Sequence, residues 1–577
     1  MADKEKLAGL FAEIAQWLEL KGENPFKIRA YENAARIFEQ LDADLAVLAQ
    51  NGTLEDIPGV GPAIAGKAAE FISTGRIKYH DELKESIPPV LFEMIRISGL
   101  GAKKAVALQT KLNLSSIGEL EYACRENRLL DLPGFGAKTQ AKILAGIEAL
   151  RRFQGRFLVS DALPVALEFK ERIRKISSVS AVEVAGSLRR RKETAGDVDI
   201  VVGATDSTPV MNAVLEMPNV EAVIAHGPTK TSVTLGNGLN VDVRVVAPAE
   251  YPCALHHFTG SKEHNVLLRS LAKERGIKIN EYALEKENGE RLEITDEAAI
   301  YRILEMDYIE PELREGGDEL QAAREHRLPV LVKEEELQGS FHMHTAWSDG
   351  RAALPQMVSS ARALGWKYIG ITDHSRSAFY AGGLTEKAVF EQRQEIDAFN
   401  ASQNDFTVFS GIESDILPDG SLDYPESILR QFDFIIGSVH SSFGLTREAM
   451  TRRLTQAMQN PYLTMLGHPT GRLLLARDGY EVDLDEIIKV AAATKTVVEI
   501  NASPYRLDLD WRWCRQAKEY GVLFAINPDA HSPEELKNVS YGVGIARKGW
   551  LEATDILNTR TVAEVAAVFK RKHMPAP

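Results

Sequence analysis

From residue 338 onward, short apolar runs alternate with amphipathic segments. The apolar runs are GSFHMH, KYIGITDH, FTVFSGIE, FDFIIGSVH, YLTMLGH and LFAINPDAH, and their length and their β-branched and aromatic residues predict strands. The segments between them, including residues 354–364 and 484–493, carry apolar residues at helical spacing. This alternation is typical of a parallel α/β structure, and it predicts a closed β/α barrel.

Residue types that bind metal ions follow or close these predicted strands, at the end where parallel barrels carry their chemistry. A period of two residues would point His342 and His344 to one side of their strand. The nine candidates are too many for one ion, so the pattern predicts a bridged site for two or three ions. Mn²⁺, Zn²⁺ and Fe²⁺ all accept such ligands. The candidates are His342, His344, Asp349, His374, Glu413, His440, His468, Asp529 and His531.

The motifs HMH, TDH, GIES, SVH, GHP and PDAH resemble the PHP (polymerase and histidinol phosphatase) metallohydrolase family over about residues 338–572. The resemblance implies a distorted β/α barrel with up to three ions. It assigns His342, His344, Glu413 and Asp529 to one ion, Glu413, His440 and His468 to a second, and Asp349, His374 and His531 to a third. Such a site cleaves phosphoesters with metal-activated water. Arg376, Arg472 and Arg506 are either phosphate clamps or a solvated rim.

Three segments of the first third repeat one pattern, in which an apolar residue precedes a Gly-x-Gly turn that opens a helix. They are DIPGVGPAIAGKAAEFI from Asp56, RISGLGAKKAVALQT from Arg96 and DLPGFGAKTQAKILAGI from Asp131. The glycines are Gly59, Gly61, Gly99, Gly101, Gly134 and Gly136. The repeats resemble the helix-hairpin-helix motif, which presents backbone N–H groups to DNA phosphates without reading sequence. A single copy would read equally well as an ordinary tight turn.

The middle third carries a second constellation, in VEVAGSLRRRKETAGDVDIVVG and LNVDVRVVA. Asp197 and Asp199 share one face of a predicted strand because alternate residues point to the same side. Asp242 lies on a nearby predicted strand and completes a three-carboxylate set. The pattern predicts a catalytic site for two Mg²⁺ or Mn²⁺ ions that transfers a nucleotide from a dNTP to a primer 3′-hydroxyl. The alternative is a solvated acidic strand face.

This pattern resembles the nucleotidyltransferase palm of family X DNA polymerases. AYENAARIF, HHFTGSKEHN and DYIEPELREG resemble that family's DNA-end-binding domain, nucleotide pocket and thumb. The resemblance makes Asp197, Asp199 and Asp242 metal ligands. It makes Gly186, Ser187, Arg190, His257, Gly260, Lys262 and Asn265 the nucleotide-binding residues. His257 and Lys262 depart from the family's usual pocket residues, Ala195 replaces a serine near the triphosphate, and Asn240 replaces an arginine that steadies the third aspartate.

Lys67 stands where the family has a Schiff-base lysine that removes a 5′-deoxyribose phosphate, and it is a candidate for lyase chemistry. A surface lysine that faces a DNA phosphate is the alternative. The combination of both halves resembles the bacterial and archaeal family X polymerases that carry a carboxyl-terminal PHP domain.

Length and composition fit this organisation. At 577 residues the chain should hold several domains. The expected fold is multidomain, α+β and α/β, with boundaries as follows: an end-binding helical domain at 1–85, fingers at 86–155, palm at 156–250, thumb at 251–318, a semi-rigid linker or partly helical tether at 319–337 and the PHP domain at 338–577. The net charge of −14 argues against an unstructured electrostatic grip on nucleic acid.

Three scattered cysteines and the lack of a long apolar run predict a cytoplasmic protein that does not enter a membrane, and nothing indicates a dimer seam, so a monomer is expected. The predicted function is a repair polymerase that fills gaps in gapped or primer-template DNA, with a PHP 3′ to 5′ exonuclease. The resemblance also implies cleavage at abasic sites. Two rivals are a PHP phosphatase or nuclease with an inactive polymerase-like part, and a non-enzymatic protein that bridges DNA ends.

Overall fold

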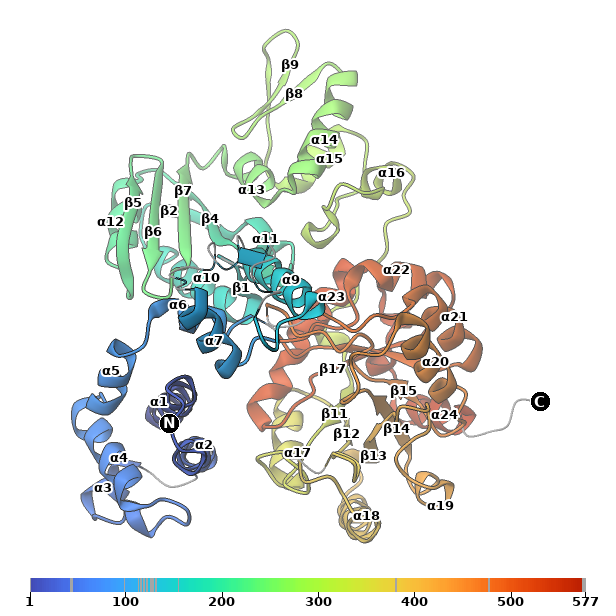
Figure 1. The fold of residues 1–577 in the computed structure, drawn as a ribbon. Helices are drawn as coiled ribbons and strands as arrows, with labels where there is room; N and C mark the ends of the chain where they lie inside the picture. Colours follow the sequence, from blue (N-terminus) through green and yellow to red (C-terminus); the bar gives the residue numbers. More distant parts are fainter. Residues whose placement is uncertain are drawn as a thin grey trace. The chain divides into compact units, whose positions relative to one another are not determined.

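The computed structural model describes residues 2–41, 45–97, 99–112, 114, 117, 120, 123–124, 129, 132–153, 155–378, 381–475 and 478–572. The chain folds as two compact units, Met1–Gln154 and Gly155–Pro577. Figure 1 shows an all-helical first unit and a second unit that contains an open sheet, a small helical and hairpin segment, and a barrel. Among the described residues, no helix combines the length and apolar character needed to cross a membrane.

The first unit is built on two long antiparallel helices, α1 (Ala2–Leu20) and α2 (Pro25–Gln40). Phe11 of α1 packs on Tyr31 and Phe38 of α2, with ring centroids 6.0 and 5.4 Å apart. Proline at its first position and the Asn24 side chain, which accepts from the Phe26 N–H, start α2. The remaining helices are α3 (Leu45–Gln50), η1 (Leu54–Asp56), α4 (Pro62–Thr74), α5 (Lys78–Glu85), α6 (Pro89–Met94), α7 (Ala102–Leu112) and α9 (Ala137–Phe153).

The three Gly-x-Gly repeats fold alike. The first glycine of each, Gly59, Gly99 or Gly134, has a φ of 88°, 83° or 86°, which is the left-handed region that favours glycine. The residue between the glycines donates its N–H in the same way each time: Val60 to Ile57, Leu100 to Ile97 and Phe135 to Leu132, at 3.0 to 3.1 Å. Helices α4, α7 and α9 each begin directly after the second glycine. Two residues of these motifs, Ser98 and Asp131, lie outside the described residues.

The second unit opens with a five-stranded sheet in the order β2-β4-β7-β6-β5. Its strands are β2 (Val179–Val184), β4 (Asp197–Ala204), β5 (Val220–His226), β6 (Lys230–Leu235) and β7 (Asn240–Val246). Strands β4 and β7 run parallel with Asp199 opposite Asp242, while the other pairs are antiparallel. Helices α10 (Val159–Ile173) and α12 (Thr208–Leu215) pack on the sheet, and the short strands β1 (Phe157–Leu158) and β3 (Thr194–Ala195) pair beside it. The parallel register therefore brings two carboxylates side by side.

A smaller helical segment follows, with a three-stranded antiparallel hairpin sheet. The palm helix α11 (Gly186–Arg189) contacts this segment. The segment's own elements are α13 (Tyr251–Thr259), α14 (Lys262–Glu274), β8 (Ile277–Ile279), β9 (Leu284–Lys286), β10 (Arg291–Leu292), α15 (Glu297–Ile303), η2 (Pro311–Leu313) and α16 (Glu319–Arg324). Part of the expected linker at 319–337 is helical, in α16 and in η3 (Glu334–Glu336). Leu320 and Ala323 of α16 are buried in this segment's core, and Val332 binds the barrel through Leu551, because apolar residues interrupt the charged run.

The carboxyl-terminal part is a nearly closed barrel of seven parallel strands in sequence order, as the alternating pattern predicted. Strand β17 closes on β11 where the His344 N–H donates to the Ala530 carbonyl at 2.8 Å. The strands are β11 (Gly339–Met343), β12 (Tyr368–Ile371), β13 (Thr407–Asp415), β14 (Phe434–Ser438), β15 (Met465–Leu466), β16 (Val497–Asn501) and β17 (Phe524–Asn527). The helices are α17 (Leu354–Ala363), α18 (Glu386–Ala401), α19 (Glu426–Leu429), α20 (Arg447–Met458), α21 (Leu484–Thr494), α22 (Trp511–Glu519), α23 (Val539–Lys548) and α24 (Val562–Lys572).

An aromatic cluster fills the amino-terminal end of the barrel. Phe341, Tyr368, Phe409, Phe434 and Phe569 contact one another, and Phe569 of α24 stacks on Phe434 with centroids 4.9 Å apart. Because apolar rings occupy this end, polar side chains inside the barrel gather at the carboxyl-terminal end of the strands.

The repeated turn gives a matched pair of substitutions. Gly134→Ala places a side chain at a φ of 86°, so we expect the free energy of unfolding of the first unit to fall by about 1–2 kcal/mol. Gly136→Ala is the control, because Gly136 has an ordinary φ and open space around its Cα, and it should change stability by less than about 0.5 kcal/mol. Thermal unfolding measures both, and equal effects would contradict the strained-turn explanation.

Candidate metal centres and nucleotide site

The metal-ligand candidates of the barrel converge at the carboxyl ends of the strands. His342 and His344 both place Nε2 at 3.4 Å from Asp529 Oδ1. They do so through an irregularity rather than a regular period of two, because the register of β11 shifts between Ser340 and Met343 and His342 has a φ of 58°. The expected convergence of the two histidines is therefore present, but a bulge produces it.

Four groups of donor atoms, each group within 4.8 Å, form among the described residues of the barrel. They include all nine candidates but differ from the three sets implied by the PHP resemblance. Glu413 is not grouped with His344 and Asp529, His344 also joins the Asp349 group, and His440 and His468 fall into separate groups that share Glu413. The groups are His344, Asp349, His374 and His531; His342, Glu413 and His468; His342, His344 and Asp529; and His374, Glu413 and His440.

Glu413 is the common member, and its side chain is only 1% exposed. Its Oε1 lies 3.2 Å from His342 Nε2, 3.1 Å from His468 Nε2 and 3.2 Å from His440 Nε2, while Oε2 lies 3.0 Å from His374 Nδ1. Burial opposes ionisation of Glu413, yet the surrounding histidines hold its pKa well below the usual range. One carboxylate thus links four histidines from four strands.

The histidines are shifted in opposite directions by their surroundings. Although burial works against it, Glu413 raises the pKa of His374 to about 10 and that of His440 to about 9. Burial, together with the charges of the neighbouring His531 and His374, lowers the pKa of His344 to about 3. A cluster with this mixture of imidazole and carboxylate donors fits divalent cations, which replace protons on the ligands.

Unsatisfied nitrogen atoms test that fit. His342 Nε2 and both ring nitrogens of His344 are buried and make no hydrogen bond of acceptable geometry to the described residues, although carboxylate oxygens lie 3.2 to 3.7 Å away. Buried polar atoms are normally paired, so several such atoms pointing at one another indicate a missing partner. A divalent ion bound by imidazole and carboxylate groups satisfies them.

Two carboxylates that the sequence analysis did not single out contact the ligand histidines on the side away from the cluster. Glu499 on β16 lies 2.5 Å from His342 Nδ1 and accepts the His468 N–H at 2.5 Å. Asp415 lies 2.7 Å from His440 Nδ1. Each fixes which ring nitrogen faces the cluster. An acidic residue inside an otherwise apolar strand, as in VVEIN, was the available signal for Glu499.

The three candidate phosphate clamps have different surroundings. Arg472 is committed to structure, because Nε donates to the Arg506 carbonyl at 2.9 Å, Nη1 to Asp510 at 2.8 Å, and Nη2 to the Leu507 carbonyl. Arg376 is half exposed and bonds to the Asp423 carbonyl. Arg506 places Nε 3.6 Å from Asp529 Oδ2, so it lies against the metal-ligand candidates.

The palm carboxylates form a second, more open site. Burial raises the pKa of Asp199 to about 7, and the neighbouring charges of Asp197 and Asp242 add to the shift. Gly186, with a φ of 59°, packs so closely that a Cβ there would lie 2.2 Å from Asp199 Oδ2. The three carboxylates are not among the described groups whose donor atoms all lie within 4.8 Å. Their mutual repulsion nevertheless favours a bound cation.

Lys230 supplies a positive charge that the sequence analysis missed. Its Nζ lies 2.6 Å from Asp242 Oδ2. Asn240, which stands where the family has an arginine, instead accepts a hydrogen bond from Thr234. The cation beside the third aspartate therefore comes from the neighbouring strand β6, and strand alternation alone gave no reason to select it.

The expected nucleotide-binding residues lie where the palm meets the segment that follows it. Arg190 donates from Nη1 to the Thr259 carbonyl at 2.5 Å and from Nε to Glu315 at 3.0 Å. Asn265 donates to the His257 carbonyl at 2.8 Å, and Gly260 has a φ of 70°. The structure places Ser187 in α11 beside Gly186, and leaves Lys262 exposed in the first turn of α14.

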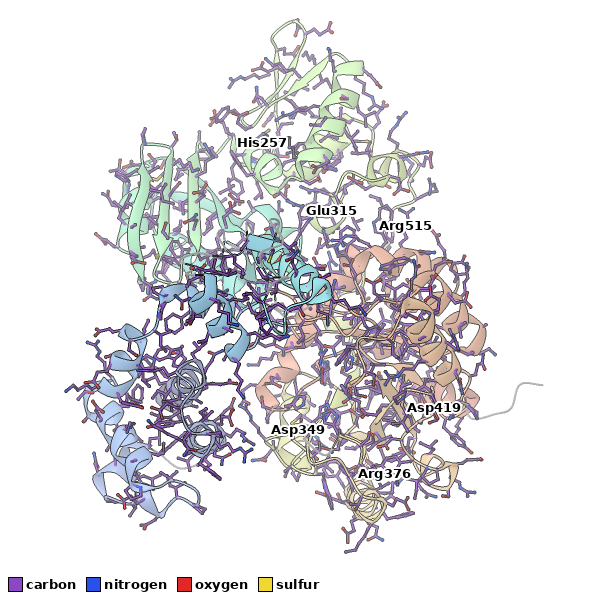
Figure 2. The ribbon with its side chains drawn as sticks, viewed as in Figure 1. His257, Glu315, Asp349, Arg376, Asp419 and Arg515 are labelled. Atoms are coloured by element: carbon purple, nitrogen blue, oxygen red, sulfur yellow. The ribbon has the colours of Figure 1, made fainter. Side chains whose placement is uncertain are left out.

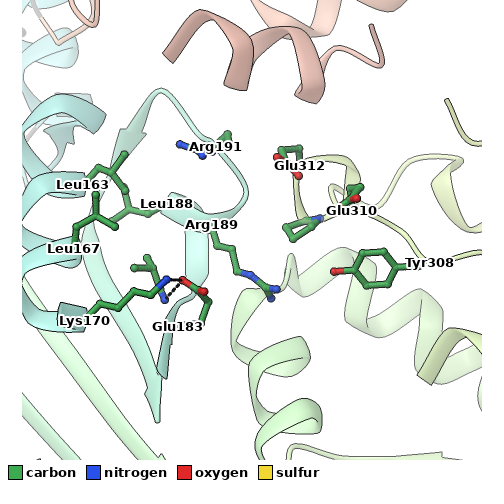
Figure 3. A pocket seen from close by; sticks show the side chains of 12 residues that line it. Leu163, Leu167, Lys170, Glu183, Leu188, Arg189, Arg191, Tyr308, Glu310 and Glu312 are labelled. Carbon is green, nitrogen blue, oxygen red and sulfur yellow. Dashed lines mark hydrogen bonds and ion pairs between the residues drawn. The ribbon is translucent and has the colours of Figure 1, made fainter. Parts of the chain in front are cut away.

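His257, which is labelled in Figure 2, has its Nδ1 2.8 Å from Arg269 Nη2, and burial and this guanidinium lower the pKa of His257. A cavity of about 370 Å³ is lined in part by Leu188 and Arg189 of α11. Figure 3 shows Arg189 extending from α11 toward Tyr308 across this cavity, with Glu312 on the opposite wall. Arg189 forms an ion pair with the buried Glu297.

The role of Glu499 can be tested through metal affinity. Glu499→Gln places an amide among several N–H donors, so we expect the affinity of the barrel for Mn²⁺ to fall by about 10–100-fold, measured by calorimetric titration of the full chain. Asp433→Asn is the control, because Asp433 precedes β14 at the end of the strand opposite His440 and accepts the N–H of Ser410 on β13. Unchanged affinity in the Glu499 variant would show that it does not position the ligands.

Comparison with known proteins agrees with both halves of this description. Family matches cover a helix-hairpin-helix domain at residues 2–77, a SAM-like helix-hairpin-helix tandem at 92–149, a DNA polymerase beta thumb at 254–315 and a PHP domain at 340–503. The chain is 38% identical over 571 residues to the DNA polymerase/3′-5′ exonuclease PolX of Bacillus subtilis, which covers 98% of this chain and 99% of that protein.

Two further relatives each match one half. A probable phosphatase of Caldicellulosiruptor saccharolyticus is 34% identical over 211 residues, or 34% of this chain and 80% of the phosphatase. DNA polymerase lambda of Rattus norvegicus is 25% identical over 288 residues, or 45% of this chain and 48% of that polymerase. The end-to-end match outweighs both partial ones, and the chain belongs to the family X DNA polymerases that carry a carboxyl-terminal PHP domain.

Proposed function

We propose that this protein is a DNA repair polymerase that fills short gaps by nucleotidyl transfer, and that its barrel is a metal-dependent 3′ to 5′ exonuclease. The observation that carries the proposal is the presence of two separate acidic centres on one chain that is similar from end to end to a DNA polymerase/3′-5′ exonuclease. Its substrates are gapped or primer-template DNA and dNTPs. The three glycine turns bind the DNA backbone through helix amino termini.

In the palm, Asp197, Asp199 and Asp242 would hold Mg²⁺ or Mn²⁺, which supply activation of the primer 3′-hydroxyl and charge neutralisation at the triphosphate. Lys230 holds the Asp242 side chain in place through its ion pair. The turn at Gly186 and Ser187, together with Arg190, would bind the triphosphate next to Asp199. His257, Gly260, Lys262 and Asn265 would line the sugar and base.

In the barrel, the nine candidate ligands would hold two or three divalent ions, with Mn²⁺ favoured, and these supply activated water and charge stabilisation at phosphorus. Arg506 lies beside Asp529 and would bind a non-bridging oxygen of the scissile phosphate. Glu499 and Asp415 orient His342 and His440. Which of the nine ligands would share an ion follows from the groups that their side chains form.

A primer-extension assay separates the two centres. On a labelled primer in one-nucleotide-gapped duplex with Mn²⁺, Asp199→Ala should abolish extension and leave dNTP-free shortening intact, whereas His344→Ala should do the reverse. Removal of metal by a chelator should stop both reactions, and added Mn²⁺ should restore them. Glu221→Ala in the palm and Asp419→Ala in the barrel are exposed-carboxylate controls.

The rival functions are outcomes of the same assay. Shortening without extension by the unaltered protein would mean that the palm is inactive and the protein is a nuclease. No change in primer length, with hydrolysis of a small phosphomonoester, would favour a phosphatase, the activity named for the relatives of the barrel. Binding of two DNA ends without either reaction would favour end bridging.

A lyase activity at Lys67 is a second candidate, supported by its surroundings. Lys67 Nζ lies 4.9 Å from the centre of the Tyr79 ring and donates to the Ala63 carbonyl at 3.2 Å. Burial lowers the pKa of Lys67, and the charge of Lys27 lowers it further. A lower pKa leaves more of the amine neutral and nucleophilic at neutral pH.

Borohydride trapping tests this activity directly. Incubation with DNA that carries a 5′-deoxyribose phosphate should give a covalent adduct with the unaltered protein and none with Lys67→Ala. Lys78→Ala, a change of an exposed lysine in α5, should leave the adduct unchanged. An adduct that persists in Lys67→Ala would assign the nucleophile to another lysine.

A further inference from the structure

A lysine of the barrel reaches into the polymerase half. Lys548 is the last residue of α23, and its side chain is fully buried. Its Nζ lies 3.1 Å from the backbone carbonyl oxygen of Arg190 and 3.3 Å from that of Glu312, and it forms an ion pair with Glu315. All three partners belong to the polymerase half. Figure 2 shows Glu315 at the boundary between the two parts.

Glu315 is shared among three cations. Its Oε1 accepts from Arg190 Nε at 3.0 Å in addition to Lys548, and its Oε2 lies 3.0 Å from Lys192 Nζ. Burial opposes ionisation, but Lys548 and the other cations lower the pKa of Glu315 to about 2. The carboxylate is therefore ionised and divided between Arg190, Lys192 and Lys548.

This sharing affects the charge that Arg190 offers to a ligand. Arg190 lies near enough to Asp199 for its charge to lower the pKa of that carboxyl, so it belongs to the electrostatic environment of the palm site. With Lys548 present, the group of three cations and one carboxylate keeps two net positive charges. Without Lys548, Glu315 would bind Arg190 more tightly, and the backbone of Arg190 would lose a hydrogen bond.

We propose that Lys548 is a positioning residue for nucleotidyl transfer: the barrel supplies the buried cation that engages Glu315 and anchors the Arg190 backbone, which keeps the Arg190 guanidinium available to the triphosphate of an incoming dNTP. This inference rests on the proposed function, because it takes Arg190 as a triphosphate-binding residue. It makes the PHP domain a structural part of the polymerase site, independently of nuclease chemistry.

A second contact across the same boundary provides a matched control. Arg515 of α22 forms an ion pair with Asp318, at 2.5 Å, and stacks on Trp550. Like Lys548, it connects the barrel to the polymerase half. Neither Arg515 nor Asp318 forms an ion pair with Arg190 or Glu315 among the described residues, so removal of Arg515 weakens docking without changing the charge at Arg190.

The test measures kcat and KM for the complementary dNTP on one-nucleotide-gapped duplex. Lys548→Met should raise KM about five- to tenfold, the size of effect typical of directly coupled buried groups, with a smaller change in kcat. Arg515→Ala should leave KM unchanged. The double variant Lys548→Met with Glu315→Gln should recover KM to within about threefold of the unaltered protein, since the carboxylate that would hold Arg190 is gone.

The dNTP-free nuclease activity of each preparation checks folding of the barrel. A Lys548→Met protein with full nuclease activity and unchanged KM would overturn the proposal, and so would equal KM increases in the Lys548 and Arg515 variants. If Lys548→Met does not fold, the KM of Lys548→Gln is the test, because this variant keeps a donor for the two carbonyls and removes only the charge. An unchanged KM in Lys548→Gln would also overturn the proposal. Absence of extension by the unaltered protein would instead mean that the proposed polymerase function has failed.

Discussion

A buried carboxylate surrounded by histidines is the interaction on which the barrel site depends. Glu413 is almost fully excluded from solvent, and four imidazoles contact its two oxygens. An isolated charge at this depth would cost several kcal/mol, so Glu413 requires opposite charge close by. Imidazolium groups provide it in the absence of metal, and divalent ions provide it when bound. The same residues therefore account both for stability of the strand ends and for metal binding.

The convergence of the ligands requires a strained backbone conformation at three of them. His342, His468 and Asp529 have φ values of 58°, 21° and 52°, a region that non-glycine residues seldom adopt. All three follow or interrupt short strands at the carboxyl end of the barrel. The aromatic cluster at the opposite end fixes where the strands begin. A rigid apolar base and strained polar ends together aim the side chains inward.

The palm also holds several carboxylates close together, in a site that is less buried than the barrel cluster. Burial raises the pKa of Asp199, repulsion from Asp197 and Asp242 adds to that shift, and Lys230 offsets part of the repulsion at Asp242. This site is more open than the barrel cluster, in keeping with one that must admit a primer end and a nucleotide.

The sequence predicted the features that depend on residue type and strand position. The barrel, the nine ligand candidates and the glycine turns follow from local periodicity, which one chain reveals. Glu499, Lys230 and Lys548 were missed because their importance comes from partners distant in sequence. The burial of Leu320 and Ala323 was missed for a related reason, because the charged run around α16 conceals this pair. Long-range pairing of isolated charged residues has no periodic signature.

The segment 189–193 connects the two centres physically. Arg189 binds Glu297, Arg190 binds Glu315, and Glu193 lies 3.5 Å from Arg472 of the barrel. Arg472 in turn donates to the backbone carbonyls of Arg506 and Leu507, which hold Arg506 beside Asp529. These links are ion pairs and hydrogen bonds, which depend more steeply on geometry than apolar packing does. This segment therefore contacts the groups around the palm site and, through Arg472, the backbone that holds Arg506 beside Asp529.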